Sequence, residues 1–306
     1  MTRVFVVDAT VPRGGAYMAY HIGRLIHQQS GHPLIHVPIT NIKGDIFDYD
    51  VPMTTIPGEH VRQSLTAQDI FICNPSAASS PQFGLRLPGK KIMYIQDFRT
   101  YAYLDCHFDI YACVSTLVQD FLRATYQLDV PVIPPFIDVS DAGQIAPWHT
   151  RPAHTALVYL KSQSREHMHV YQWLKQNLAV LYPELQLIEL PSDYKLSHSD
   201  LMQKVSSARY LLNVCIAEGF GLVPLEAMAL GTIPFGLNGL AGRDYMRYGE
   251  NSFCLNYKDM NYENLQKLVY DMQQIQGFPD QEIAKARSYS QEAFYQNWGQ
   301  LLSKHL

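Results

Sequence analysis

The sequence has no long apolar run, and no stretch approaches the roughly eighteen residues that a bilayer-spanning helix needs. The opening residues, MTRVFVVDATVPRGG, have too short an apolar part to resemble a secretory signal. Hydrophobic residues make up 47% of the 306-residue chain and charged residues 17%, which is typical of a globular protein with a large core. We therefore predict a cytoplasmic protein of one large or two medium domains. Peripheral contact with the inner face of a membrane stays open.

Cysteine is scarce, and its five positions show no metal-ligand spacing. The number is odd and most of the positions lie within apolar runs, which favours buried free thiols in a reducing compartment over disulfides. No dedicated metal site is therefore predicted. The five are Cys73, Cys106, Cys113, Cys215 and Cys254.

The chain also lacks an excess of charge of either sign. Its formal net charge is −4, and lysine plus arginine against aspartate plus glutamate number 10 to 11 in residues 1–134 and 14 to 17 in residues 135–306. Since neither half is basic, the sequence gives no electrostatic support for binding nucleic acid.

The most informative segment is residues 217–231, AEGFGLVPLEAMALG. It places Glu218 and Glu226 on either side of a glycine-containing turn that leads into a predicted helix. Pro224 suits the first helical position, and Glu226 would then lie in the first turn, where the helix dipole favours negative charge. The backbone N–H groups of residues 220–223 are expected to form an anion site. The loop thus offers donors for a phosphate and acceptors for hydroxyl groups, and a sugar nucleotide has both.

An ordinary capped helix start would explain a lone Gly-x-Gly, because short glycine motifs match by chance. The setting argues for more than that. Residues 210–215, YLLNVC, form a short apolar run typical of a buried parallel strand, and residues 232–235 begin another strand after Gly231 ends the helix.

On these residues the chain resembles the retaining, nucleotide-sugar-dependent glycosyltransferases of the GT-B fold, the family-four group with a Glu-x7-Glu signature. The resemblance runs from Glu218 through Gly231 and more loosely to residues 249–251. It implies that Glu218 lies beside the transferred sugar, with Gly219 and Phe220, and that Glu226 binds the ribose hydroxyls. It further implies transfer with retention, no metal ion and no separate cofactor.

Alternating apolar strands and helical patterns along both halves predict an α/β protein with two Rossmann-like, doubly wound domains and a cleft between them. We expect an acceptor-side domain at residues 1–140 and a nucleotide-sugar-binding domain at 154–285, joined by a linker at 137–153. The resemblance implies that a C-terminal helix, residues 286–306, crosses back onto the first domain. Strands are expected at 3–7, 34–38, 69–73, 91–95, 110–114, 130–133, 155–160, 186–190, 210–215, 232–235 and 252–255.

Further residues are candidates for the donor diphosphate. Gly14 and Gly15 lie between a strand and a helix, where their amides could meet a phosphate; the alternative is a tight turn. Lys161 and Arg165 follow the strand at 155–160 and could neutralise the departing diphosphate, although the family has the reverse order of Arg and Lys. The backbone amides of Gly221, Leu222 and Val223, at the start of the predicted helix that contains Glu226, are the remaining candidates for binding the diphosphate.

No histidine lies plainly where many family members have one on the first domain. Asp97, after the strand at 91–95, is the candidate catalytic group there, and its alternative is a turn or helix-capping aspartate. His107 is a weaker candidate. Ser115 reads most simply as a helix N-cap.

The predicted function is glycosyl transfer from a UDP- or GDP-sugar to a saccharide, a lipid-linked acceptor or another hydroxyl acceptor. The resemblance places this reaction in surface polysaccharide or glycolipid assembly. One alternative is a non-catalytic sugar-nucleotide-binding partner of another transferase. A Rossmann oxidoreductase is the other alternative, but the first strand is not followed by Gly-x-Gly-x-x-Gly.

Overall fold

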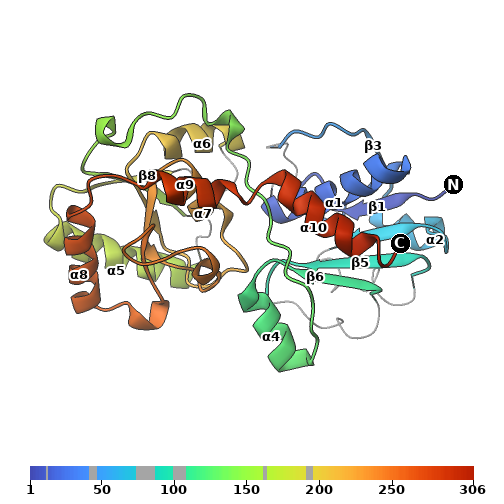
Figure 1. The fold of residues 1–306 in the computed structure, drawn as a ribbon. Coiled ribbons are helices and arrows are strands. Elements are labelled where there is room, and N and C mark those ends of the chain that lie inside the picture. The colour runs from blue at the N-terminus through green and yellow to red at the C-terminus, as the bar shows by residue number, and fades with distance from the viewer. Residues whose placement is uncertain (12, 41–46, 74–86, 99–107, 161–163, 191–195) are drawn as a thin grey trace. The chain divides into compact units, whose positions relative to one another are not determined.

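The computed structural model describes residues 1–306 except 12, 41–46, 74–86, 99–107, 161–163 and 191–195. It divides into two compact units, one formed by Met1–Phe136 with Gln291–Leu306 and the other by Ile137–Ser290. The predicted linker, residues 137–153, therefore belongs to the second unit. Each unit is an α/β structure built on a parallel sheet (Figure 1).

Unit 1 contains, among its described residues, a six-stranded sheet of order β3-β2-β1-β4-β5-β6. All pairs are parallel, and Val4 lies opposite both Leu34 and Ile70. The apolar strands VFVV and IFIC are buried along their whole length, as expected of a parallel sheet covered on both faces. The strands are β1 (Val4–Val7), β2 (Leu34–Val37), β3 (Met53–Thr55), β4 (Ile70–Cys73), β5 (Lys90–Ile95) and β6 (Ile110–Cys113).

The helices of unit 1 include α1 and the C-terminal helix α10, which pack against each other (Figure 1). On the inner side of α10, Phe294 and Trp298 are buried, and the Trp298 ring meets Tyr94 of β5 edge-on at 5.3 Å. The helices are α1 (Gly14–Ser30), α2 (Val61–Ser64), α4 (Thr116–Tyr126) and α10 (Gln291–Leu302).

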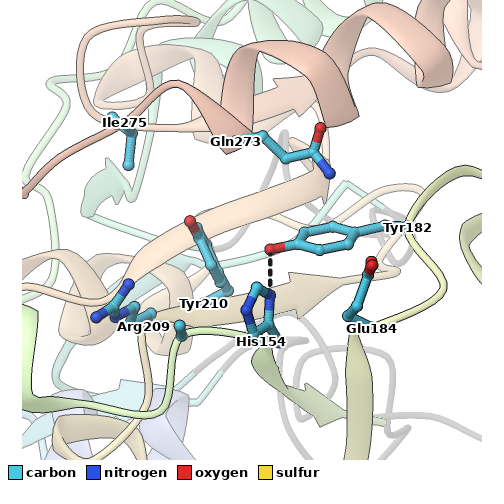
Figure 2. Close-up of a pocket in the computed structure, with 8 residues that line it drawn as sticks. His154, Tyr182, Glu184, Arg209, Tyr210, Gln273 and Ile275 are labelled. Carbon is cyan, nitrogen blue, oxygen red and sulfur yellow. Dashed lines mark hydrogen bonds between the residues drawn. The ribbon is translucent and has the colours of Figure 1, made fainter.

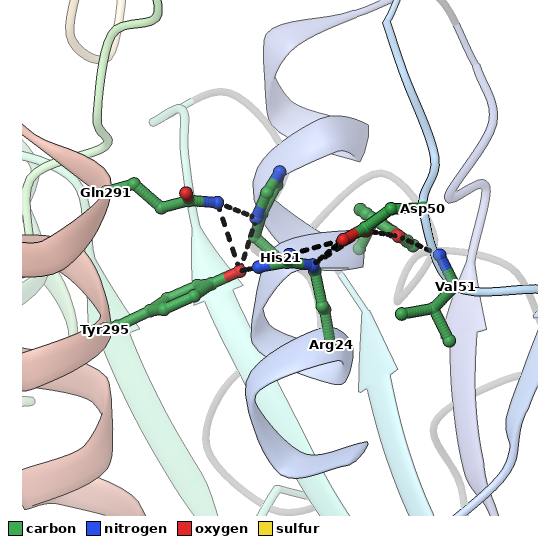
Figure 3. Close-up of polar contacts among 7 residues, drawn as sticks. His21, Arg24, Asp50, Val51, Gln291 and Tyr295 are labelled. Carbon is green, nitrogen blue, oxygen red and sulfur yellow. Dashed lines mark hydrogen bonds and ion pairs between the residues drawn. The ribbon is translucent and has the colours of Figure 1, made fainter. Parts of the chain in front are cut away.

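A polar cluster also ties α10 to α1 (Figure 3). The Tyr295 hydroxyl lies 2.6 Å from Arg24 Nη1 and 2.7 Å from His21 Nδ1, and Gln291 Nε2 lies 2.9 Å from the same histidine nitrogen. Arg24 in turn donates to Asp50, and this hydrogen bond lowers the pKa of Asp50 to about 2 against the opposing effect of burial. The last helix of the chain is thus part of the first unit, as the resemblance implied.

Unit 2 contains, in its described part, a five-stranded parallel sheet of order β11-β10-β9-β7-β8. The order reverses direction between β7 and β9, so right-handed crossovers place helices on both faces. Accordingly α5 packs with α8, while α7 packs with α6 and α9. The strands are β7 (Thr155–Tyr159), β8 (Gln186–Leu190), β9 (Tyr210–Asn213), β10 (Ile233–Leu237) and β11 (Phe253–Leu255). The helices are α5 (Arg165–Leu181), α6 (His198–Ser206), α7 (Leu222–Ala229), α8 (Tyr262–Gln273) and α9 (Asp280–Arg287).

Arg151 is a buried cation that joins the ends of α6 and α7. Its guanidinium donates to the backbone carbonyls of Ala208 at 2.9 Å, Leu230 at 2.7 Å and Gly231 at 3.2 Å, and only 5% of the residue is exposed. These carbonyls lie at the negative ends of the two helices, which favours a cation there.

One predicted strand is wrong, and one observed strand was not predicted. Residues 130–133 form no strand: Val132 makes only an isolated bridge to Cys113, because Pro131 and Pro134 have no N–H to donate. Conversely, the strand β3 (Met53–Thr55) was not predicted, since one half-buried and two exposed residues show no apolar alternation.

Of the five cysteines, Cys106 lies outside the described residues and the other four are free thiols. Cys73, Cys113 and Cys254 are buried, which confirms the prediction for them. In the portion of the chain that the structure describes, no helix has both the length and the apolarity required to cross a bilayer.

Candidate functional site

The candidate site of unit 2 lies at the carboxyl edge of its sheet, around the point between β7 and β9 where the strand order reverses. Ligands of open α/β sheets bind in the crevice outside such a switch point. The segment between β9 and α7 ends in what we call the glutamate loop, residues 217–221. It is therefore at the position where a nucleotide is expected.

The glutamate loop is fastened to the loop after β10. The Glu218 amide donates to the carbonyl of Gly239 at 3.0 Å, and Glu218 and Leu240 form a parallel bridge. A Cβ atom at Gly239 would lie 3.0 Å from Glu218 Oε1, so the glycine leaves room for the glutamate side chain. Glu218 itself is half-buried. The structure thus brings residues 239 and 240 against Glu218.

Gly221 is required at the end of this loop by both conformation and space. Its φ is +93°, a left-handed conformation that other residues rarely adopt. A Cβ atom would also lie 2.7 Å from both Glu218 Oε1 and the Tyr245 hydroxyl. That hydroxyl donates to the Gly221 carbonyl at 2.6 Å, and the Asn251 side chain donates to the Tyr245 carbonyl at 3.0 Å. Burial raises the pKa of Tyr245 well above its ordinary value, so the phenol stays a donor.

Helix α7 begins at Leu222, two residues before Pro224, the predicted first helical residue. Pro224 is consequently the third helical residue rather than the first, and Glu226 is the fifth, beyond the first turn. Proline is tolerated there because the first N–H groups of a helix have no partner within it. Gly221 provides no side-chain cap, so the predicted anion site at the amides of Leu222 and Val223 stays a prediction that this helix start is compatible with.

Glu226 is buried, with 5% of the residue exposed, and its partner is His198. Glu226 Oε1 lies 2.9 Å from Nε2 of His198, the first residue of α6. Burial lowers the pKa of His198, but the charge of Glu226 and its hydrogen bond raise this pKa by more. The net effect is a pKa above the ordinary value for histidine. Sequence reasoning missed His198, because nothing in the spacing of residues 198 and 226 links them.

In unit 1 the predicted residues Gly14, Gly15 and Asp97 lie at one edge of the sheet. Gly14 and Gly15 are the first two residues of α1 rather than a turn before it. Gln96, directly after β5, donates to the Gly15 carbonyl at 2.8 Å, and a Cβ atom at Gly15 would collide with the Gln96 side chain. Asp97 is the next residue and is half-exposed. The glycine there thus serves close packing at least as directly as it could serve a ligand.

The cationic pair predicted after β7 is only partly described. Lys161 lies outside the described residues. Arg165 is exposed at the first position of α5, whose N-cap Ser164 accepts a hydrogen bond from the His167 amide at 3.4 Å. On the first unit, His107 also lies outside the described residues. Ser115 is the N-cap of α4 as predicted, with its hydroxyl accepting from the Val118 amide at 3.3 Å.

A cavity of about 300 Å³ lies at the opposite edge of the unit 2 sheet (Figure 2). Its lining includes His154, just before β7, Glu184, just before β8, and Tyr210 at the start of β9. The Nδ1 atom of His154 lies 2.9 Å from the Tyr182 hydroxyl. These residues mark the amino ends of the strands, whereas the glutamate loop follows a carboxyl end.

Comparison with solved structures identifies the fold as that of the GT-B glycosyltransferases. HepE from Anabaena, solved in complex with UDP, matches with a TM-score of 0.68 and 12% identity over 99% of this chain and 100% of that one. The lipopolysaccharide outer core galactosyltransferase WaaB matches with a TM-score of 0.66 and 13% identity over the full length of both chains.

TarM from S. aureus, in a complex that contains UDP, matches with a TM-score of 0.58 and 11% identity over 80% of this chain. The match spans only 57% of the TarM chain. No protein-family model matches the sequence, and a search of curated proteins finds no relative. At these identities the likeness establishes the fold, and the chemistry has to be argued from the site.

Proposed function

We propose that the protein is a glycosyltransferase that moves a sugar from a nucleoside diphosphate, UDP before GDP, to an acceptor hydroxyl. The observation that carries this proposal is the glutamate loop: it places Glu218 beside Gly221 and Gly239 and continues into α7, which presents Glu226. The whole lies at the switch point of a GT-B unit. Neighbours solved with UDP support the choice of nucleotide.

Donor binding would divide between the two glutamates. The amides of Leu222 and Val223, at the positive end of α7, are suited to the diphosphate. Glu226 would accept hydrogen bonds from the ribose hydroxyls, and Glu218, which is less buried, would contact the transferred sugar. Gly219 and Phe220 would line the same sugar subsite.

The chemical problem of the reaction is charge. Breaking the anomeric bond leaves a positive sugar ring and a negative diphosphate, and preorganised groups of opposite sign stabilise both. In this proposal Glu218 favours the positive ring, Lys161 and Arg165 neutralise the diphosphate with help from the Gly14 and Gly15 amides, and Asp97 holds the acceptor hydroxyl. Attack on the face that the leaving group vacates would retain the anomeric configuration without a metal ion.

Saturation-transfer NMR with a panel of nucleotide sugars tests the proposal. We expect a UDP- or GDP-sugar to show transfer to both its base and its sugar protons, and the bound donor to be hydrolysed slowly or transferred. Binding without turnover in the presence of saccharide and lipid-linked acceptors would identify a non-catalytic partner instead. Binding of NAD in preference to every nucleotide sugar would contradict the proposal.

A further inference from the structure

A buried carboxylate needs a partner, because removing an ionised group from water costs several kcal/mol unless a hydrogen bond or opposite charge compensates. Glu226 lies within α7, and its side chain is 6% exposed. The partner that the structure places there is His198, whose side chain is 13% exposed. The pair therefore lies almost entirely out of water.

His198 is held in place by the start of its own helix. Ser197 caps α6 by accepting a hydrogen bond from the Asp200 amide at 3.0 Å, and α6 packs against α7. The cap fixes the backbone of His198, so its ring reaches Glu226 from a defined direction. The contact uses Glu226 Oε1 and His198 Nε2, 2.9 Å apart.

His198 occupies Glu226 Oε1, and among the described residues no hydrogen bond is made to Oε2. A ribose presents two adjacent hydroxyl donors, and a carboxylate held in a fixed rotation binds them at a lower entropic cost than a freely rotating one. The terminal torsion of a glutamate is broad when nothing restrains it. A hydrogen bond to one oxygen removes that freedom.

We propose that His198 is a positioning residue for nucleotide binding: by holding Glu226 Oε1, it aims Oε2 at the ribose hydroxyls of the donor. This inference rests on the proposed function and deepens it, because it assigns the ribose subsite a second residue from a different helix. Two further carboxylates near His198 also favour its charged form, and so its pairing with Glu226. Asp138 and Asp141, beside α6, add to the effect of Glu226 in raising its pKa, whereas burial lowers it.

The test compares each nucleoside diphosphate, UDP, GDP and ADP, with its 2′,3′-dideoxy analogue by isothermal calorimetry on the full chain. Wild type should bind the ribose form of its preferred nucleotide roughly tenfold tighter, the value of one good hydrogen bond to a charged group. His198→Leu should bring that ratio close to one by weakening only the ribose form. His198→Gln, whose amide can still donate to Oε1, should keep most of the ratio.

His154→Leu is the matched control, because it breaks a hydrogen bond of the same length at the other edge of the sheet. Its ratio should equal that of wild type. If His198→Leu does not fold, His198→Asn, which is too short to reach Glu226, takes its place. Equal weakening of both nucleotide forms in a folded His198 variant, or an unchanged ratio, would overturn the positioning role alone. Failure of wild type to bind any of the three nucleotides would overturn the proposed function as well.

Discussion

At the scale of single residues, the two glutamates of the signature occupy different environments. Glu218 is half-buried and lies against two glycines, whereas Glu226 is buried and joined to His198. A half-buried carboxylate can meet a changing charge on a reacting sugar. A buried, restrained carboxylate is suited to recognising a group that does not react. The different surroundings support the division of roles that we propose.

The His198–Glu226 pair predicts a pH dependence of stability. The pKa of His198 in the folded chain is lowered by burial but raised more by Glu226, Asp138 and Asp141, so it exceeds the ordinary value of 6.5. The pair therefore stabilises the fold fully below about pH 6.5 and loses this contribution as the pH rises through the folded pKa.

We expect the free energy of unfolding of wild type to fall relative to that of His198→Gln between about pH 6 and about pH 8. The reason is that the imidazolium at position 198 loses its charge in this range, whereas a glutamine has no charge to lose. Urea titrations of both proteins across this range measure the difference. The His154→Leu variant, compared in the same way, controls for changes elsewhere. A difference that does not vary with pH would show that the pair is not charged in the folded chain.

How much of the site the sequence could reveal depends on whether a residue's partners are local. Gly221 and Ser115 could be predicted, since a glycine turn and an N-cap are properties of a few adjacent residues. His198 and Tyr245 could not, because each acts on a residue 24 or more positions away. Glu226 was placed in the first turn because Pro224 was taken as the first helical residue, and the structure allows proline at the third.

At the scale of elements, α6 and α7 are connected at two places. His198 joins the start of α6 to Glu226, and Arg151 joins the ends of both helices through backbone carbonyls. Apolar side chains fill the space between these polar contacts, including Met202, Val205 and Ala227. The position of Glu226 therefore depends on contacts at both ends of the helix pair.

Replacing Arg151 should destabilise unit 2 strongly. In Arg151→Met the carbonyls of Ala208, Leu230 and Gly231 lose their charged donor, and we expect a loss of about 3 kcal/mol, within the range for hydrogen bonds to charged groups in a buried network. Arg151→Lys keeps the charge but reaches fewer carbonyls, so its loss should be smaller. Chemical denaturation followed by circular dichroism measures both. Wild-type stability in Arg151→Met would show that the carbonyls find water instead.

The bounds of strands, like the roles of single residues, could be predicted from the sequence where the signal lies in a few adjacent residues. Apolar runs located β1, β4 and β9 to within two residues, because a buried parallel strand is apolar along its whole length. The short strand β3 and the prolines at 131 and 134 do not follow that pattern. In these two segments, whether a strand forms depends on which neighbouring segments can supply backbone hydrogen bonds.

At the scale of the whole molecule, the chain returns at its end to the unit in which it began. Helix α10 supplies Phe294 and Trp298 to the core of unit 1, and its polar face joins His21 and Arg24 (Figure 3). Unit 2, by contrast, is one continuous segment, Ile137–Ser290. Unit 1 therefore needs residues from both ends of the chain to complete its core, whereas unit 2 needs only one continuous segment.

We expect a fragment of residues 137–290 to fold alone, with a cooperative thermal transition. A fragment of residues 1–136 should remain partly unfolded, because it lacks the buried Trp298, whose loss alone costs about 3–5 kcal/mol. Joining residues 291–306 to residue 136 through a flexible linker should restore folding. Dispersed amide NMR spectra report each outcome. A well-dispersed spectrum from residues 1–136 alone would contradict this assignment of α10.

The central claim, glycosyl transfer supported by Glu218, is tested most directly by Glu218→Gln. The measurement is release of sugar or nucleoside diphosphate from the donor that wild type binds, with donor affinity measured on the same samples. We predict that turnover falls at least a hundredfold, the scale of losing one group that stabilises transition-state charge, while the fold and nucleotide affinity persist. Turnover equal to that of wild type in Glu218→Gln would contradict the account.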